Sequence, residues 1–225
     1  MTTLPSSQQM FNGAAGAIEA FIDVPTPPAP YGIAVVTHPH PLQGGSALHK
    51  VPQALARCFQ QNGWLAVRPN FRGVGGSDGA HDMGFGETED VLEIVRALRA
   101  DYPGAPLALA GFSFGAFVQA RAASILNDLS SPPTHTILAG TPYGTIQGER
   151  RYETPTVPKD TLVIHGGSDS VVPLVNVMQW ATPQRLPIVV LPGANHFLTG
   201  YLDTVIGLVK NRILTARLSS VDGNT

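Results

Sequence analysis

Two serines in this chain of 225 residues lie in the pattern Gly-x-Ser-x-Gly. The pattern is typical of a serine on a tight turn between a strand and a helix, with its hydroxyl exposed for nucleophilic attack. Ser113 directly follows the apolar run PLALAG and directly precedes the alanine-rich run FGAFVQARAASIL, so its surroundings fit a strand, a turn and a helix. We predict that Ser113 is a nucleophile, and helix N-capping is the alternative role for it.

The second match, GGSDG, places Ser77 in a different context. Ser77 lies several residues after the nearest strand-like run, and no helix is expected before about Glu87. Glycine and aspartate are common in turns because they tolerate unusual backbone angles or bond to their own backbone. We therefore interpret Ser77 as a loop serine.

A serine hydroxyl reacts at neutral pH only with a base in hydrogen-bond reach and a third group that orients the base. Asp169 follows the strand-like run TLVIHG, and His196 follows the strand-like run LPIVVLPG. Because the carboxyl ends of parallel strands lie at one edge of a sheet, both side chains can meet Ser113 there. We predict a catalytic triad in which His196 is the base and Asp169 orients it.

Other roles and other residues compete with this assignment. An Asx turn would account for Asp169, and helix capping would account for His196. Asp203 is the main rival carboxylate, but it falls within the predicted last helix, where an exposed role is expected. Four other histidines are less well placed. His165 belongs to a strand and His135 precedes one, whereas His49 and His81 come too early in the chain.

Attack on an acyl carbon creates a negative oxygen that needs two N–H donors. One is predicted to be the backbone amide of Phe114, which follows the nucleophile at a helix start. The other is expected from the loop HPHPLQGG (38–45), whose two prolines carry no N–H. That leaves Leu42 or Gln43, with Leu42 preferred. The side chains predicted to bind substrate are His40, Gln43 and Tyr143.

Two alternative functions come from other features. His38 and His40 have a spacing that points two imidazoles the same way at a strand end, which suits a metal-dependent hydrolase. The further ligands of such a site are missing, since the chain has neither H-E-x-x-H nor a cysteine cluster. A non-catalytic binding module on the same fold is the second alternative. We expect neither metal nor cofactor, and a small-molecule acyl substrate as the ligand.

Strand-like and helix-like runs alternate along the chain and must position these residues. Uninterrupted apolar runs such as GIAVVTH favour strands buried on both faces. The helix-like runs carry an apolar stripe, as in 48–62, where Leu48, Val51 and Leu55 are expected on one face. Pro52 fits only near the first turn of a helix, so a later start is the alternative. Strands are predicted from Ala17 and at 32–38, 64–70, 106–111, 135–140, 161–166 and 186–193; helices are predicted at 48–62, 87–100, 114–129, 173–181 and 201–218.

This alternation predicts an α/β fold with a doubly wound, mainly parallel sheet and helices on both faces. We expect one domain over residues 1–225, in which 1–16 form a loose arm or an edge strand. Charged residues make up 13% of the chain and the net charge is −2, which argues against a nucleic-acid binder. The lone cysteine, Cys58, excludes an internal disulfide, and no signal peptide or membrane span is apparent, so we expect a cytoplasmic protein.

With these motifs in view, the chain resembles the α/β-hydrolase superfamily from about Ala17 to Leu218. Within it, the chain is similar to small bacterial hydrolases that carry THPHPLQGG, NFRGVGGSDG and HGGSDSVVP. The resemblance implies a serine hydrolase of the carboxylesterase or thioesterase type that works through an acyl-enzyme. Only 141–160 separates two strands where many members insert a helical cap, and so short a segment leaves the site open. A small or modest-sized ester or thioester is the expected substrate.

Overall fold

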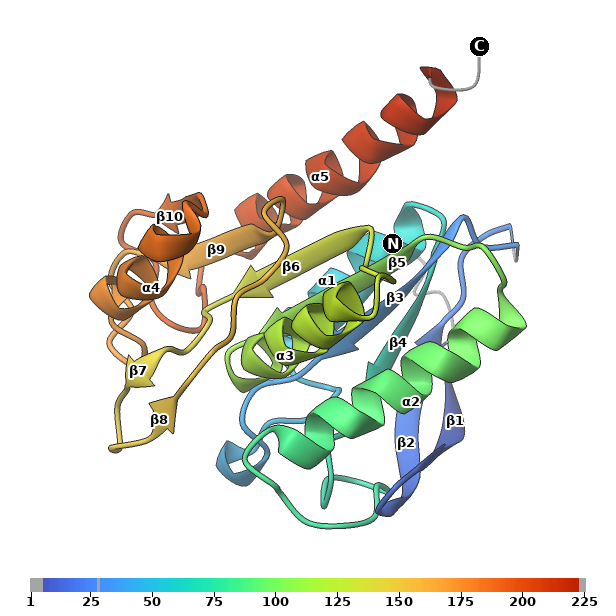
Figure 1. Ribbon diagram of the computed structural model, residues 1–225, viewed down its shortest axis with the longest axis horizontal. Coiled ribbons are helices and arrows are strands. Elements are labelled where there is room, and N and C mark those ends of the chain that lie inside the picture. Colours follow the sequence, from blue (N-terminus) through green and yellow to red (C-terminus); the bar gives the residue numbers. More distant parts are fainter. Residues whose placement is uncertain (1–5, 28, 223–225) are drawn as a thin grey trace.

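An eight-stranded sheet forms the centre of the molecule in this computed structural model (Figure 1). The structure describes residues 6–27 and 29–222, with side chains as far as Thr215. The strand order is β1-β2-β4-β3-β5-β6-β9-β10; β1 and β2 run antiparallel to their neighbours, and the strands from β4 to β10 are parallel. The strands are β1 (Ser6–Gly13), β2 (Gly16–Asp23), β3 (Gly32–Thr37), β4 (Trp64–Pro69), β5 (Leu107–Phe112), β6 (His135–Ala139), β9 (Leu162–Gly166) and β10 (Ile188–Leu191).

The central strands are apolar throughout because both of their faces are covered. In β3, Ile33 and Val35 point to one face, Ala34 and Val36 point to the other, and all four are fully buried. Side chains alternate between the two faces of a strand, so one uninterrupted apolar run supplies two separate cores.

Helices cover both faces of the sheet. Helices α2 (Phe85–Asp101), α3 (Phe114–Asp128) and α4 (Leu174–Ala181) pack on the face that carries Ile33, and Figure 1 shows α2 and α3 across the front. Helices α1 (Lys50–Gln61) and α5 (Leu202–Asp222) pack on the face that carries Ala34. The predicted α/β architecture, with a mainly parallel sheet between two helical layers, is confirmed.

One predicted helix starts later than its apolar spacing indicated. Helix α1 begins at Lys50, and the His49 side chain caps it by accepting a hydrogen bond from the Val51 amide at 3.4 Å. Leu48 therefore lies outside the helix and is 55% exposed, so its expected place on the buried face was wrong. Because His49 caps the helix, Leu48 belongs to the preceding loop and not to the buried face of α1.

The segment 141–160 contains a short hairpin and no helix, so no lid covers the sheet. The hairpin pairs β7 (Gly144–Thr145) with β8 (Arg151–Tyr152), and the sequence analysis did not predict it. Two short 3₁₀ helices were also not predicted: η1 (Pro41–Gln43), after β3, and η2 (Thr182–Gln184), after α4.

The N-terminal segment adds an antiparallel edge to the sheet. Of the predicted arm or edge strand, residues 6–13 form β1, whereas residues 1–5 lie outside the described part of the chain. Within the described residues, no helix has both the length and the apolar character needed to cross a membrane.

Candidate functional site

Ser113 stands on a sharp turn between β5 and α3. Its backbone angles are φ 55° and ψ −122°, a left-handed conformation that is costly for a residue with a side chain. The amide of Ser113 donates to the carbonyl of Ala139 at 2.8 Å, which fixes the turn against the end of β6. The side chain is held out from the backbone and remains partly exposed.

The flanking glycines are required by the packing of this turn. A Cβ atom on Gly115 would lie 2.6 Å from the carbonyl oxygens of Thr37 and His38, and a Cβ on Gly111 would collide with the carbonyl of Gly115. The Thr37 hydroxyl also donates to the Gly115 carbonyl at 2.9 Å. The end of β3 and the start of α3 can therefore approach this closely only if residues 111 and 115 lack side chains.

Ser113, His196 and Asp169 form one hydrogen-bonded chain. His196 Nε2 lies 2.9 Å from Ser113 Oγ, and His196 Nδ1 lies 2.7 Å from Asp169 Oδ2. In the neutral ring, a proton on Nδ1 is donated to the carboxylate, and Nε2 is then free to accept the hydrogen bond from the serine hydroxyl. His196 is 5% exposed and Asp169 is 8% exposed, so this chain is largely shielded from water.

The carboxylate of Asp169 is fixed on its other side as well. Its Oδ1 accepts from the amides of Val171 and Val172, at 2.9 and 2.8 Å. Burial would raise the pKa of Asp169, but the hydrogen bond and charge of His196, the Val172 amide and the nearby His165 together lower it. The carboxylate is therefore ionised near neutral pH and oriented toward His196.

Backbone contacts hold the two loops that carry these groups. The amide of Gly167 donates to the Leu191 carbonyl at 2.8 Å, and the amide of Ser168 donates to the Ala194 carbonyl at 2.9 Å. These bonds join the loop after β9, which carries Asp169, to the loop after β10, which carries His196. The distance between the two side chains is thus set by the adjacent parallel strands.

Ser77 occupies a structural position. Its hydroxyl donates to the Asn70 carbonyl at 2.8 Å and accepts from the Glu19 amide at 3.0 Å. The residue is 8% exposed. The second Gly-x-Ser-x-Gly match therefore closes a loop against β2, where its serine has no base beside it among the described contacts.

His38 is also engaged in structural contacts. The residue is fully buried; its Nε2 accepts from the Phe71 amide at 2.9 Å and its Nδ1 donates to the Pro39 carbonyl at 2.7 Å. Burial lowers its pKa to about 4, so the ring is neutral. Because both ring nitrogens are in use, His38 has no free nitrogen for a metal ion, and the geometry gives no support to a His38/His40 metal site.

The expected N–H donors lie on two helix starts. Phe114 is the first residue of α3, where amides have no partner within the helix. In the 3₁₀ turn η1, the Gln43 amide donates to the His40 carbonyl at 3.0 Å and is therefore occupied. Of the two candidates, only Leu42 has an amide with no acceptor among the described hydrogen bonds. The Leu42 side chain points to solvent and is 74% exposed.

A cavity of about 220 Å³ opens above Ser113. The predicted substrate-binding residues His40 and Gln43 line it, whereas Tyr143 is partly buried against the hydrophobic core and lies outside this lining. The burial of His40, with the charges of His81 and Arg150, lowers its pKa to about 4. The lining consists of Pro39, His40, Gln43, Gly45, His49, Ser113, Gln147, Arg150, Val171, His196 and Phe197.

Several of these lining residues were not predicted. Gln147 and Arg150 come from the hairpin. From the sequence, Arg150 and Arg151 are interpreted as a solvated turn, with contact to an acidic substrate as the alternative, and the structure places Arg150 in the lining. His49 stacks on Phe112, with ring centroids 5.6 Å apart, and reaches the cavity from the start of α1. Phe197 follows His196 directly, and its side chain is 56% exposed at the cavity mouth. For Phe197 the signal in the sequence is its adjacency to the predicted base.

The chain is similar to several known proteins. A family model described as the alpha/beta hydrolase fold matches residues 42–132. An uncharacterized protein of Rickettsia prowazekii is 32% identical over 199 residues, which cover 84% of this chain and 81% of that protein.

Solved structures extend this similarity to nearly the whole chain. An α/β serine hydrolase without a lid from Xanthomonas campestris is 32% identical, with a TM-score of 0.83 and coverage of 96% of both chains. An α/β serine hydrolase homologue from Coxiella burnetii is 30% identical, with a TM-score of 0.77 and coverage of 94% of this chain and 99% of that one. With this identity over this length, and with a serine on the turn after β5, the chain belongs to the α/β-hydrolase family.

Proposed function

We propose that this protein is a serine hydrolase that cleaves a small or modest-sized carboxylic ester or thioester through an acyl-enzyme. The observation that carries the proposal is the hydrogen-bonded chain from Ser113 through His196 to Asp169, which ends at an open cavity. A hydroxyl that donates to an unprotonated imidazole nitrogen at 2.9 Å is arranged for nucleophilic attack. The absence of a lid over 141–160 leaves the cavity accessible to substrate.

The first half-reaction forms a bond between Ser113 Oγ and the acyl carbon. His196 Nε2 takes the hydroxyl proton, and Asp169 stabilises the imidazolium that results. The carbonyl electron pair moves onto oxygen, where the amides of Phe114 and Leu42 are proposed to donate to it. When the tetrahedral intermediate collapses, the alcohol or thiol leaves with the proton from His196. Water then repeats these steps on the acyl-enzyme and releases the acid.

The test is labelling by a fluorophosphonate probe, followed by intact mass and peptide mapping. The serine oxygen forms a bond to phosphorus, fluoride leaves, and the proton passes to His196. We expect one adduct per chain on Ser113, which Ser113→Ala abolishes and Ser77→Ala retains. The two variants are matched, since each removes the serine of one Gly-x-Ser-x-Gly pattern.

Two outcomes would overturn this proposal. Labelling at Ser77, or at no serine in a folded protein, would show that Ser113 is not activated and would favour a binding module on the same fold. Hydrolysis of para-nitrophenyl butyrate that persists in Ser113→Ala and is lost with a chelator would indicate the metal-dependent alternative instead.

A further inference from the structure

Arg150 is the one cation among the residues that line the cavity above Ser113. It lies in the hairpin between β7 and β8 and is partly buried. Its Nη1 donates to Gln43 Oε1 at 3.1 Å, and its Nη2 donates to the Gln147 carbonyl at 3.1 Å. The guanidinium therefore bridges the η1 turn and the hairpin across one wall of the cavity.

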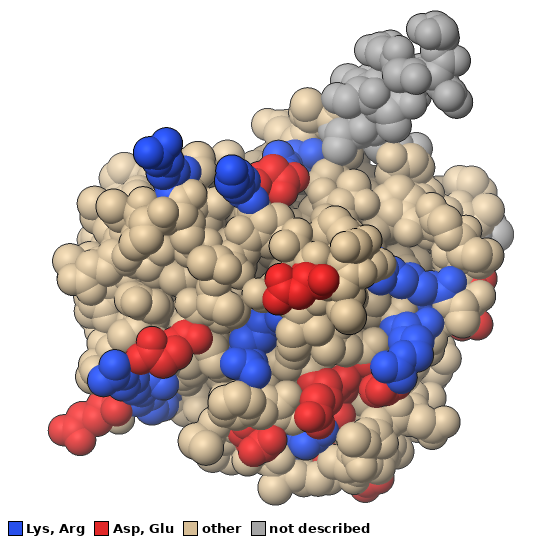
Figure 2. Space-filling view, viewed as in Figure 1, with Lys and Arg blue, Asp and Glu red and all other residues tan. Residues whose placement is uncertain are grey.

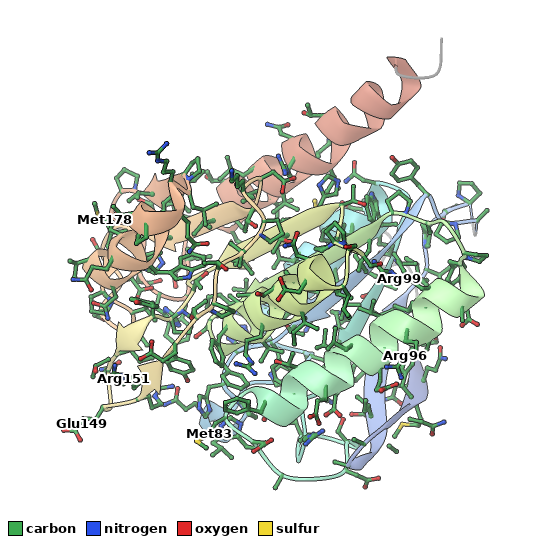
Figure 3. All side chains as sticks on the ribbon, in the orientation of Figure 1. Met83, Arg96, Arg99, Glu149, Arg151 and Met178 are labelled. Carbon is green, nitrogen blue, oxygen red and sulfur yellow. The ribbon has the colours of Figure 1, made fainter. Side chains whose placement is uncertain are left out.

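Both of these partners are neutral, so the charge of Arg150 is not compensated by an anion. Among the described residues, Arg150 makes no ion pair, whereas its neighbour Arg151 pairs with Glu153 at 2.8 Å. Arg151 and Glu149 project from the hairpin away from the body of the molecule (Figure 3). The guanidinium of Arg150 also contacts the Tyr152 hydroxyl, which is a neutral partner too. A guanidinium has five N–H donors, so these three contacts leave others for a ligand.

The other ionisable groups of the cavity do not cancel this charge. His40 and His49 are neutral near pH 7, because burial is the largest effect on each and lowers the pKa of each ring, to about 4 for His40. The carboxylate of Asp169 does not line the cavity, and its contacts are with His196, His165 and the amides of Val171 and Val172. Glu87 is fully buried, does not line the cavity and accepts from His81, Asp82 and Gly84. None of the residues that line the cavity is an aspartate or a glutamate, so its wall carries a cation and no carboxylate.

This local charge contrasts with the rest of the molecule. The chain has a net charge of −2, and on the face seen in Figure 2 basic and acidic side chains are interspersed. On this face, no extended basic patch would attract anions in general.

The hairpin that carries Arg150 is anchored to the same loop as Asp169. The Gln147 amide donates to the Val171 carbonyl at 3.0 Å, and the Ile146 amide donates to the Arg150 carbonyl at 2.9 Å. Asn176 of α4 holds the base of the hairpin through the carbonyls of Tyr143 and Thr145, at 2.9 and 2.8 Å. These bonds fix the guanidinium relative to the reacting groups, which specificity requires.

We propose that this cavity selects an ester or thioester that carries a carboxylate or another anionic group, with Arg150 as the binding partner of that group. The inference rests on the proposed function, because it names the substrate class of the same site. Arginine suits this role, since its planar fork binds a carboxylate through two parallel hydrogen bonds. The anionic group lies on the acyl part or on the leaving group of the substrate, and the experiment separates these two cases.

The experiment compares kcat/KM for two matched pairs of esters. One pair, para-nitrophenyl hemiadipate and para-nitrophenyl hexanoate, differs by a carboxylate on the acyl part. The other pair, the butyrate esters of meta-hydroxybenzoate and meta-hydroxybenzamide, differs by a carboxylate on the leaving group. For each pair, the ratio of anionic to neutral kcat/KM is measured in the wild type and in the Arg150 variants.

We expect Arg150→Gln to lower this ratio by about 10- to 100-fold in one of the pairs, the range typical of a hydrogen bond to a charged group. Arg150→Lys keeps the charge but loses the fork, so it should restore the ratio only in part. Arg151→Gln is the matched control, because that side chain is paired with Glu153 outside the cavity, and it should leave both ratios unchanged. Lys50→Gln, which removes a cation from a neighbouring cavity, should also leave them unchanged.

A second measurement needs no variant. In the wild type, raising NaCl from about 20 to about 500 mM should lower the anionic rate and leave the neutral rate nearly constant, because salt screens the attraction. If both ratios in Arg150→Gln stay within about twofold of the wild type, or if the anionic rate does not respond to salt, the assignment of Arg150 is wrong. Hydrolysis of the neutral esters and labelling of Ser113 would still stand in that case, so the two proposals fail separately.

Discussion

Replacement of Asp169 by asparagine tests how the structure sets the protonation of His196. The new side chain has one oxygen and one NH₂ group, and its orientation is determined by its neighbours. The Asp169 Oδ1 position faces the amides of Val171 and Val172, at 2.9 and 2.8 Å. An NH₂ group there would face two donors and lose both bonds, so the oxygen must occupy it and the NH₂ must face His196 Nδ1.

This orientation reverses the hydrogen bond to His196. Nδ1 must now accept, so the ring proton moves to Nε2, which faces Ser113 Oγ at 2.9 Å in the wild type. An Nε2 that already carries a proton cannot take one from the serine. We expect kcat for para-nitrophenyl butyrate to fall about 10,000-fold, or ~5.4 kcal/mol in activation free energy, as for other triads in which the histidine has the wrong tautomer.

The assay combines steady-state kinetics, the rate of fluorophosphonate labelling and a urea denaturation curve. Asparagine keeps the contacts of the carboxylate, so the free energy of unfolding should change by no more than about 2 kcal/mol. Asp203→Asn is the control, because that carboxylate lies exposed in the first turn of α5 and should leave kcat unchanged. A folded Asp169→Asn enzyme with a kcat within about tenfold of the wild type would refute the reasoning about the tautomer.

Three further predictions concern the fold. Gly115→Ala places a Cβ 2.6 Å from the His38 carbonyl and should lower the free energy of unfolding by about 3 kcal/mol or more in urea denaturation; an unchanged midpoint would contradict this. The pKa values of His38 and His135 are lowered by burial from 6.5 to about 4, so below pH 6.5 the unfolded chain binds more protons than the folded one. Each histidine should therefore lower the free energy of unfolding by about 2 kcal/mol at pH 5 relative to pH 7. Equal urea midpoints at pH 5 and pH 7 would contradict this. Arg68 pairs with the buried carboxylate of Asp23 at 2.7 Å. Arg68→Ala leaves this carboxylate without its cation and should lower the free energy of unfolding by about 3–5 kcal/mol in the same assay. A loss below about 1 kcal/mol would show that water replaces the cation.

Local sequence was sufficient to distinguish the two Gly-x-Ser-x-Gly patterns. Both have the same glycine spacing, but only Ser113 lies between an apolar run of strand length and a helix-forming run. The structure places Ser113 on that turn and Ser77 in a loop. The neighbouring residues carry this distinction because backbone conformation at a strand–helix junction depends mainly on the adjacent elements. That Ser113 is the nucleophile stays a prediction until it is labelled.

Residues whose place depends on distant packing were harder to predict. Leu48 fits the apolar spacing of α1, but the helix is capped at His49 and begins at Lys50, after Leu48. Tyr143 follows a strand at the correct edge of the sheet, as a pocket residue would, yet its side chain packs inward against the core. In both cases the local pattern fits two arrangements, and contacts with other elements decide between them.

The cavity wall is the clearest case of a feature set by tertiary structure. Arg150 and Gln43 are far apart in the sequence, and they meet because the hairpin is tied to the loop after β9 while η1 follows β3.

By itself, the sequence determined the alternation of strands and helices, because hydrophobic periodicity and turn residues act over short distances. It also placed Ser113, Asp169 and His196 each just after a strand. Only the tertiary structure decided which of the remaining side chains share the cavity with them, because that depends on how loops from separate strands pack against one another.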